Sequence, residues 1–281
     1  MSRKGATVST HTVSVGNVEI ISLLDTPFEL PWQIFFPERS ESDFDSYREL
    51  YPDSYGEGRF RTQAGCYAIR SQGQTILCDT GIGPGPIQFL GGIRGSLLDD
   101  MRNKGVPPTE VDTVFFTHLH GDHVGWNLSA DGAVNFPKAR YLVPRADWDY
   151  FGKMLETNPQ MRQVTPLAEK GVMDIISGEQ TLTSEVTTYP TPGHTPGHTS
   201  LLISSSSERA IITGDLAHHP AQIDHVEWCS SFDADAATTT ETRRRVLDQV
   251  EADGLTAAFC HFPHPFGKLV RLEGKRVFQA L

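Results

Sequence analysis

The sequence of 281 residues predicts a layered α/β fold with its functional site at one edge of the sheets. Short apolar runs typical of strands alternate with segments typical of helices, and clusters of His and Asp follow directly after several of these runs. Hydrophobic residues make up 38% of the chain and charged residues 21%, with 25 Gly and 18 Pro. This composition is typical of a globular protein with many loops, and it excludes a fibrous or disordered chain.

The first part of the chain predicts strand pairs, a loop and a helix before the first polar cluster. Alternating apolar residues indicate the strands, and Gly and Pro mark the breaks. In order, we expect a hairpin over 12–24 that turns at Gly16-Asn17, strands over 65–69 and 75–79, a loop over 81–86, a helix that Ser96 caps and Gly105 ends, and a buried strand over 111–117.

The second part repeats this arrangement. We expect strands over 140–143, 186–189, 200–203 and 210–213, a charged helix over 234–252, and a last strand over 256–260. The interleaved order again favours layers of sheet and helix.

An aromatic-rich segment over about residues 26–62 interrupts this pattern. It holds nine aromatic residues among acidic residues and prolines. Such a segment is typical of a lid over a substrate pocket or of a dimer contact, so a homodimer is possible. The alternative is a segment that packs on its own domain and has no further role.

The clearest motif is Thr117-His118-Leu119-His120-Gly121-Asp122-His123, directly after a predicted strand. His118 and His120 alternate, so an extended backbone directs both rings to the same side. The chain can turn at Gly121 and present Asp122 and His123 as a second pair. Nitrogen and oxygen donors so closely spaced suit a divalent metal such as zinc.

Three further donors follow predicted strands later in the chain. His194 lies in the run Pro-Gly-His-Thr-Pro-Gly-His, Asp215 ends Thr-Gly-Asp, and His261 follows the last predicted strand. Together with the first cluster they give seven donors, enough for two metal ions that share one carboxylate. We expect His198 to play a structural or supporting role, and we favour His261 over His264 as the last donor. His11 and His225 are expected at the surface.

These motifs, in this order, resemble the metallo-β-lactamase superfamily from about Val13 to the end of the chain. The resemblance implies a four-layer αβ/βα sandwich that forms a single domain over residues 1–281. It implies that His118, His120 and His194 hold the first metal, that Asp122, His123 and His261 hold the second, and that Asp215 bridges them. The His at position 120 matches the hydrolytic members, whereas the redox diiron branch has Glu there.

The same resemblance implies a hydrolytic mechanism. A water that bridges two metal ions becomes hydroxide near neutral pH, and Asp122 is a candidate to bind this nucleophile or pass a proton to the leaving group. In the acyl-homoserine lactonase branch a Tyr lies three residues beyond the bridging Asp. Here the position is His218, either a hydrogen-bond donor or general acid, or a supporting histidine.

The segment from Asp122 to Asn127 and the Cys-His-Phe-Pro run at 260–263 are similar to the acyl-homoserine lactonases and to phosphotriesterases of the methyl parathion hydrolase type. We therefore expect a dinuclear hydrolase that acts on a lactone or related carboxylic ester. The alternative is a phosphotriester or aryl ester substrate at the same site. A glyoxalase II-type thioesterase, iron-dependent sulfur oxidation and a non-catalytic binding protein on this fold are less favoured.

The composition disfavours some classes of partner and indicates where the protein is located. The net charge of −11 disfavours nucleic acid, and no apolar run reaches the ~20 residues of a membrane span. The start of the chain lacks a secretory signal, and the four cysteines form no C-x-x-C pair, so we expect buried thiols and a cytoplasmic location. Zinc is the expected metal, although Mn, Co or Fe would accept the same donors.

Overall fold

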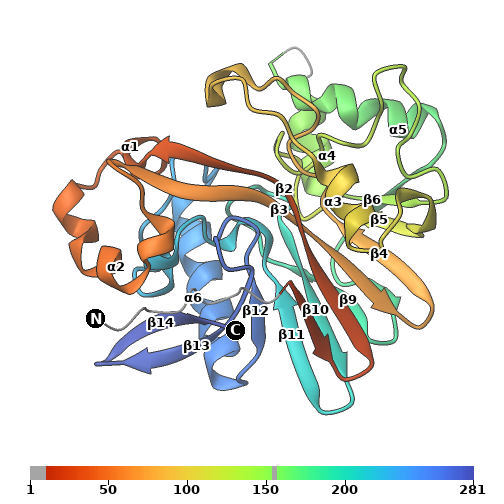
Figure 1. Cartoon of the computed structure of the whole chain (residues 1–281). Coiled ribbons are helices and arrows are strands. Elements are labelled where there is room, and N and C mark those ends of the chain that lie inside the picture. Colours follow the sequence, from red (N-terminus) through yellow and green to blue (C-terminus); the bar gives the residue numbers. More distant parts are fainter. Residues whose placement is uncertain (1–10, 154–156) are drawn as a thin grey trace.

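Two seven-stranded mixed sheets form the centre of the computed structural model, which describes residues 11–153 and 157–281 (Figure 1). The first sheet contains, in spatial order, β1 (Thr12–Val15), β2 (Val18–Pro31), β3 (Arg59–Ser71), β4 (Gln74–Cys78), β5 (Thr113–Phe115), β6 (Arg140–Pro144) and β7 (Met173–Ile176). The second contains β14 (Lys275–Ala280), β13 (Phe266–Leu272), β12 (Thr256–Ala258), β11 (Glu208–Ile212), β10 (Thr199–Ser205), β9 (Val186–Pro190) and β8 (Thr181–Thr183).

Strand direction changes within each sheet. In the first sheet β1 to β4 pair antiparallel, and β4 to β7 pair parallel. In the second sheet only the pair β11 and β12 is parallel among the described strands. The parallel pair β11–β12 is joined by the longest helix, as a crossover connection requires.

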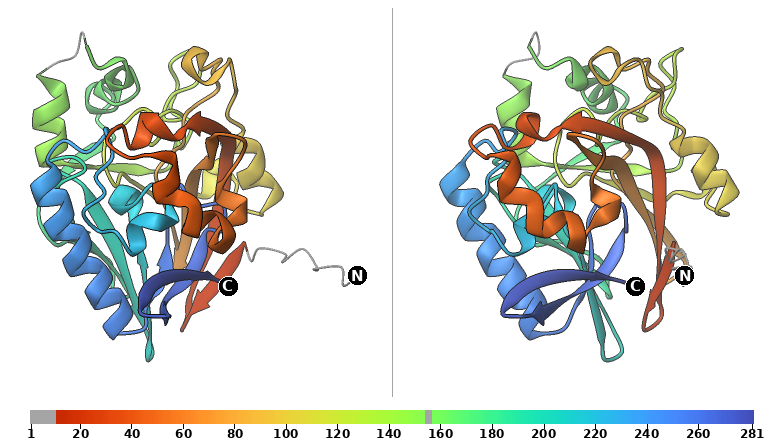
Figure 2. Two further views of the ribbon diagram at one scale, coloured as in Figure 1. Left: turned by 90° about the vertical axis from the view of Figure 1, so that its left-hand side faces the viewer. Right: turned by 60° about the vertical axis from the view of Figure 1, so that its left-hand side comes forward.

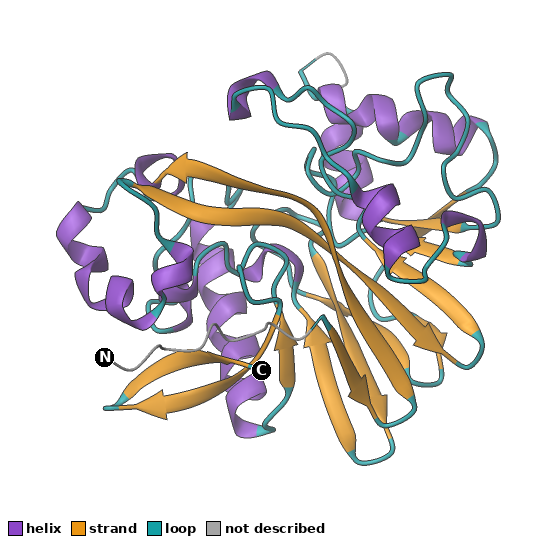
Figure 3. Ribbon diagram, in the orientation of Figure 1, coloured by secondary structure: helices purple, strands orange, loops and turns teal. Residues whose placement is uncertain are grey.

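Helices cover the outer faces of both sheets (Figure 3). Residues of α3, α4 and α5 pack on the first sheet, and α6 packs on the second. Their bounds are α3 (Leu97–Asn103), α4 (Arg145–Gly152), α5 (Thr165–Glu169) and α6 (Ala236–Ala252). The predicted four-layer αβ/βα sandwich is therefore confirmed.

Neighbouring residues of one strand pack into different layers, because side chains alternate across a sheet. In β5, Val114 packs under the helices of the first sheet, and Phe115 packs between the sheets. In β11, Ile211 packs against α6, and Ile212 packs between the sheets. This double burial explains the short apolar runs at 114–116 and 210–212.

The aromatic-rich segment forms the ends of β2 and β3 and the short helices α1 (Trp32–Phe35) and α2 (Asp45–Leu50) between them (Figure 2). Its aromatic side chains make a cluster of their own, which also contains Ala221 and Trp228 from the far half of the chain. The segment therefore packs on the chain that follows Asp215.

Several predicted bounds need correction. The strand over 256–260 ends at Ala258 and is not the last, because β13 and β14 follow it. Helices α4 and α5 and strands β7 and β8 were not expected, since each is short and lacks a clear period. Ser96 precedes α3 without a side-chain cap, and buried Asp25 accepts the Leu97 N–H at 2.8 Å instead. The hairpin at Gly16-Asn17 and the loop over 81–86 are confirmed.

No helix in the described ranges combines the length and the hydropathy that crossing a membrane requires.

Candidate metal centre

The seven predicted donors come from four loops that follow strands at the same edge of the two sheets. His118 to His123 follow β5, His194 lies between β9 and β10, Asp215 follows β11, and His261 follows β12. The structure brings all seven into one cluster, although the first and the last, His118 and His261, lie at opposite ends of the series in the sequence.

Three histidine rings meet at the first position. Nε2 of His118 lies 3.1 Å from Nδ1 of His120 and 3.2 Å from Nε2 of His194. Nδ1 of His120 lies 2.9 Å from Nε2 of His194. Oδ2 of Asp215 completes the group, 3.3 Å from the His194 nitrogen.

The second position lies on the other side of Asp215. Nε2 of His261 is 3.1 Å from Oδ2 of Asp215, and Nε2 of His123 is 3.2 Å from Oδ1. Oδ2 of Asp122 lies 3.8 Å from the His123 nitrogen and 3.7 Å from the His261 nitrogen. Asp215 therefore contacts donors of both groups.

These distances fit metal ions better than hydrogen bonds. Ligand atoms arranged tetrahedrally at about 2.0–2.1 Å from zinc lie roughly 3.3 Å from one another, close to the separations here. Three ring nitrogens that face each other cannot all be satisfied by the protons they carry. Nε2 of His123 is buried and has no hydrogen-bond partner among the residues that the structure describes. The donor set of imidazole and carboxylate suits a borderline divalent ion.

Partners on the far side of the rings fix their orientation. Nδ1 of His194 donates to Asp233 at 2.8 Å, and Nδ1 of His123 donates to Asp79 at 2.9 Å. Nδ1 of His261 donates to the backbone carbonyl of Gln63 at 2.7 Å. Each bond leaves the Nε2 lone pair directed to the centre, as is usual for metal-binding histidines.

Sequence reasoning missed these supporting carboxylates. Asp79 ends a predicted strand, as Asp215 does, and this position was the available signal. Its oxygens also accept the backbone N–H and hydroxyl of Thr117, both at 2.8 Å.

Asp147, in the first turn of α4, is a second missed carboxylate. It is fully buried and accepts the backbone N–H of Leu119 at 3.0 Å. It also accepts the Thr195 hydroxyl at 2.9 Å and the Gly197 N–H at 2.6 Å. One side chain thus joins the two loops that carry His118, His120 and His194. Burial raises the pKa of Asp147 to about 6 against these hydrogen bonds.

The surroundings of the cluster shift the pKa values of its histidines in opposite directions. Burial and the neighbouring His194 lower the pKa of His120 to about 3. Burial opposes charge on His194 as well, but the nearby carboxylates of Asp215 and Asp233 raise its pKa to about 9. Burial disfavours the charged carboxylate of Asp215, yet the surrounding histidines hold its pKa well below the usual range. The site therefore keeps its central carboxylate ionised.

A cavity of about 380 Å³ opens onto the cluster. Donor residues form one part of its lining, and most of the rest is apolar: Phe28, Leu30, Phe35, Ile82, Ile87, Phe89, Leu90 and Phe232. Gln160 and His218 are the other polar side chains among its described lining residues, and none is Lys or Arg. The first three apolar residues belong to the aromatic-rich segment.

His218 lies where sequence reasoning expected a functional side chain. It is buried, lines the cavity, and its Nε2 is 3.3 Å from Oδ2 of Asp215. Neither ring nitrogen has a hydrogen-bond partner among the described residues. The next residue, His219, stacks on Phe60 with ring centroids 4.2 Å apart and so ties this loop to the aromatic-rich segment.

The other histidines lie outside the donor set. His264 pairs with Asp53 at 2.9 Å, away from the cluster, which agrees with the preference for His261. His198 accepts the backbone N–H of Asp215 at 3.0 Å, a supporting contact. His11 is exposed as expected. His225 is only partly exposed, because its ring stacks on Trp228 at 4.0 Å.

All four cysteines are free thiols. Three are buried as predicted, but Cys229 is only partly buried, where its sulfur contacts the Thr240 hydroxyl.

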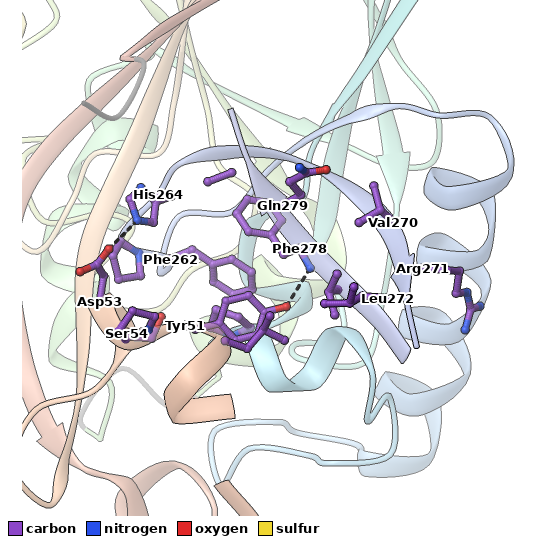
Figure 4. Close-up of a pocket in the computed structure, with 16 residues that line it drawn as sticks. Tyr51, Asp53, Ser54, Phe262, His264, Val270, Arg271, Leu272, Phe278 and Gln279 are labelled. Atoms are coloured by element: carbon purple, nitrogen blue, oxygen red, sulfur yellow. Dashed lines mark hydrogen bonds and ion pairs between the residues drawn. The ribbon is translucent and has the colours of Figure 1, made fainter. Parts of the chain in front are cut away.

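A second cavity of about 670 Å³ lies between the end of α2 and the strands β13 and β14 (Figure 4). Phe262 and Phe278 line it, and the His264–Asp53 pair lies at its side. It contains none of the seven donors, so it is separate from the metal-binding cluster.

Comparison with known proteins shows the family and agrees with the fold. The family model described as Metallo-beta-lactamase superfamily matches residues 60–261. An N-acyl homoserine lactonase from Bacillus sp is 25% identical over 63% of this chain and 73% of its own length. Among solved structures, the hydrolase AbOPH has a TM-score of 0.84 at 24% identity, covering 98% of both chains. The dizinc quorum-quenching lactonase AidC has a TM-score of 0.83 at 21% identity, covering 96% of both chains.

Proposed function

The chain belongs to the metallo-β-lactamase superfamily, and from that premise we propose that this hydrolase uses two metal ions to open a lactone or a related carboxylic ester. The observation that carries the proposal is that five of the seven donors line a largely apolar cavity of about 380 Å³: His120, Asp122, His194, Asp215 and His261. A cavity of this size and lining suits a small, mostly apolar substrate.

Each donor has a proposed place. His118, His120 and His194 would hold the first ion, Asp122, His123 and His261 the second, and Asp215 would lie between them. Two divalent ions there would acidify a water and polarise the oxygen of the substrate carbonyl. Zinc is the proposed metal, and Mn, Co or Fe would also accept these donors.

Two side chains of the cavity are proposed to handle protons. Hydrolysis adds the water oxygen to the acyl carbon and breaks the bond to the alcohol oxygen, which must gain a proton. Asp122 lines the cavity and can accept the proton of the attacking water and deliver it to that oxygen. His218 can donate a hydrogen bond to the substrate oxygen, since its nitrogens have no protein hydrogen-bond partner in the described structure.

Two observations support a lactone over other esters. The relatives named N-acyl homoserine lactonase align with most of the chain. The described lining lacks Lys and Arg, which suits a neutral substrate and disfavours the anionic substrates of a glutathione thioesterase or a nuclease. The aromatic-rich segment over 26–62 would serve as the apolar wall or lid for an acyl chain. A homodimer that uses this segment remains a prediction.

A phosphotriester or aryl ester is the second candidate substrate class. Four phenylalanines line the cavity and would pack against an aryl leaving group: Phe28, Phe35, Phe89 and Phe232.

The first test is ring opening of short-chain and long-chain acyl homoserine lactones by protein loaded with zinc, with metal content measured on the same sample. We expect turnover by the unmodified chain and none by His120→Ala, which loses a ligand of the first position. Full metal content without turnover of any lactone would exclude the lactonase proposal. Aryl phosphotriesters and aryl esters would then separate the second candidate from an inactive protein.

His218 can be tested in the same assay. We expect His218→Phe to lower kcat by about 10²-fold or more with two metal ions still bound, because a hydrogen-bond donor is lost. His218→Tyr should recover much of the activity, since the phenol supplies a donor. Loss of one metal ion in His218→Phe would instead assign the ring to metal binding.

A further inference from the structure

Cys260 lies directly beside the central carboxylate of the metal-binding cluster. Its sulfur is 3.0 Å from Oδ1 of Asp215, within hydrogen-bonding distance of a thiol, and the residue is buried. In the sequence it begins the Cys-His-Phe-Pro run, where it was expected to be a buried thiol and was given no role at the site. Among the four cysteines it is the one whose described contacts include a predicted metal donor.

The two oxygens of Asp215 face different surroundings. Oδ2 lies 3.1–3.7 Å from nitrogens of four histidines, His118, His194, His218 and His261. Oδ1 contacts the His123 nitrogen at 3.2 Å and the Cys260 sulfur at 3.0 Å. Rotation of the carboxylate would move Oδ1 toward the four histidines and Oδ2 toward His123. A hydrogen bond from the Cys260 thiol to Oδ1 would oppose that rotation.

Core packing restricts the movement of the Cys260 side chain. Its side chain belongs to the core between the two sheets, together with Phe266 and Tyr67. Phe266 and Tyr67 are themselves buried, and their rings lie 5.6 Å apart. A sulfur held by this packing has little freedom to leave Asp215.

We propose that Cys260 is a positioning residue, whose S–H donates to Oδ1 of Asp215 and holds the carboxylate in the orientation that serves the second metal position. The proposal rests on the two-ion site proposed above. It differs from direct ligation by sulfur, for which the donor atoms of His123, Asp215 and His261 lie close enough. In our assignment the sulfur keeps its proton and stays outside the ligand set.

The test uses cobalt(II) as the probe and needs no substrate. The full-length chain, Cys260→Ser and Cys260→Ala are stripped of metal and titrated with cobalt(II) while the visible and near-ultraviolet spectra are recorded. Cys260→Ser keeps a hydrogen-bond donor at nearly the same place. Cys78→Ala is the matched control, because it removes a buried thiol from the same core without touching Asp215. Thermal unfolding checks that each variant is folded.

We expect the unmodified chain and Cys260→Ser to bind two equivalents without a thiolate-to-cobalt charge-transfer band. Cys260→Ala should bind the first equivalent normally and the second about 10- to 100-fold more weakly, the usual effect of losing a group that orients a ligand. Cys78→Ala should behave like the unmodified chain.

Two outcomes would overturn the inference alone. The first is an unchanged second equivalent in Cys260→Ala. The second is a charge-transfer band in the unmodified chain that Cys260→Ser loses, which would make the sulfur a ligand. Binding of one equivalent by the unmodified chain would overturn this inference together with the two-ion site. Lactone turnover, measured separately, decides the substrate proposal.

Discussion

At the residue scale, buried carboxylates outside the lining of the cavity hold the donors in place. Asp79, Asp147 and Asp233 each accept hydrogen bonds from the loops that carry the histidines. A buried carboxylate is costly unless it is hydrogen-bonded, so such residues are found where the backbone must be fixed. The site is therefore a network in which ligand geometry depends on residues outside the motif.

Asp147 gives a direct test of this dependence. Asp147→Ala leaves three donors without their acceptor, and each buried unsatisfied group costs about 1–3 kcal/mol. We expect a fall of roughly 3 kcal/mol or more in the free energy of unfolding, and first-metal affinity lower by about 10- to 100-fold. Urea unfolding and metal titration measure the two effects. Asp149→Ala, at an exposed position of the same helix, is the control and should change neither.

At the element scale, the aromatic-rich segment contacts both the cavity beside the donors and the loop after Asp215. Phe35, the last residue of α1, lines the cavity and contacts the rings of His218 and Phe232 at centroid distances of 6.0 and 5.7 Å. The same short helix exposes Ile34 on its outer side. Helix α1 therefore contains a residue that lines the cavity, Phe35, and an exposed apolar neighbour, Ile34, that can serve as its control.

This pair tests the proposed acyl-chain wall. We expect Phe35→Ala to lower kcat/KM for a long-chain lactone by roughly tenfold, which corresponds to about 1.4 kcal/mol of lost apolar contact. The short-chain lactone should lose much less, because it does not reach the wall. Ile34→Ala should leave both values unchanged. Equal losses of kcat/KM for the two chain lengths in Phe35→Ala would mean that the side chain stabilises the structure of the site and does not contact the acyl chain.

The segment is also fixed to the second sheet, through Tyr51. The Tyr51 hydroxyl accepts the backbone N–H of Phe278 in β14 at 2.8 Å. Burial raises the pKa of Tyr51 to about 12, against an ordinary value of about 10. Between these two values the unfolded chain loses the proton and the folded chain keeps it, so stability falls as pH rises from about 10 to about 12.

We therefore expect Tyr51→Phe to be less stable at pH 7, by about 1 kcal/mol, because the Phe278 N–H loses its acceptor. The difference from the unmodified chain should shrink at pH 11, since the variant no longer has this phenol to ionise. Urea unfolding at the two pH values gives both numbers. Tyr150→Phe, at an exposed tyrosine, should show no such change. A difference that is constant with pH would contradict the assignment.

At the scale of the whole molecule, the metal-binding cluster joins the two sheets. His118, His120, Asp122 and His123 follow the first sheet, whereas His194, Asp215 and His261 belong to loops of the second. Bound ions would therefore join the two halves of the sandwich at one edge. The two sheets also meet in the apolar core that contains Phe115 and Ile212, and hydrogen bonds such as those of Asp147 join the two halves.

Metal removal should accordingly lower the stability of the entire chain. An ion that binds only the folded state stabilises it by about 2.7 kcal/mol at a free concentration of 100 times Kd. We expect a chelator to lower Tm clearly and added zinc to restore it. His120→Ala, which removes a proposed ligand, should show a smaller chelator effect. An unchanged Tm after verified metal removal would show that the sheets are held together without the ions.

The layered fold and the donor set could be predicted from the sequence because both depend on local signals. The segments 114–116 and 210–212 are buried and apolar, and donors follow each of them closely in the sequence. Short elements gave no such signal. Helix α5 has five residues and β8 has three, too few to show a period, so contacts with the rest of the chain decide their conformation.

The sequence by itself determined the class of fold, the family and the identity of the clustered donors, since ligand type and spacing are written in single segments. Only the tertiary structure decided which side chains form hydrogen bonds with the donors and with the loops that carry them. Asp147 lies 28 positions from Leu119 and 50 from Gly197, and Cys260 lies 45 from Asp215. These partners meet because the two sheets pack against each other and bring the ends of distant strands to one edge. Hydrogen bonds between such segments depend on that packing, and nothing local in the sequence encodes them.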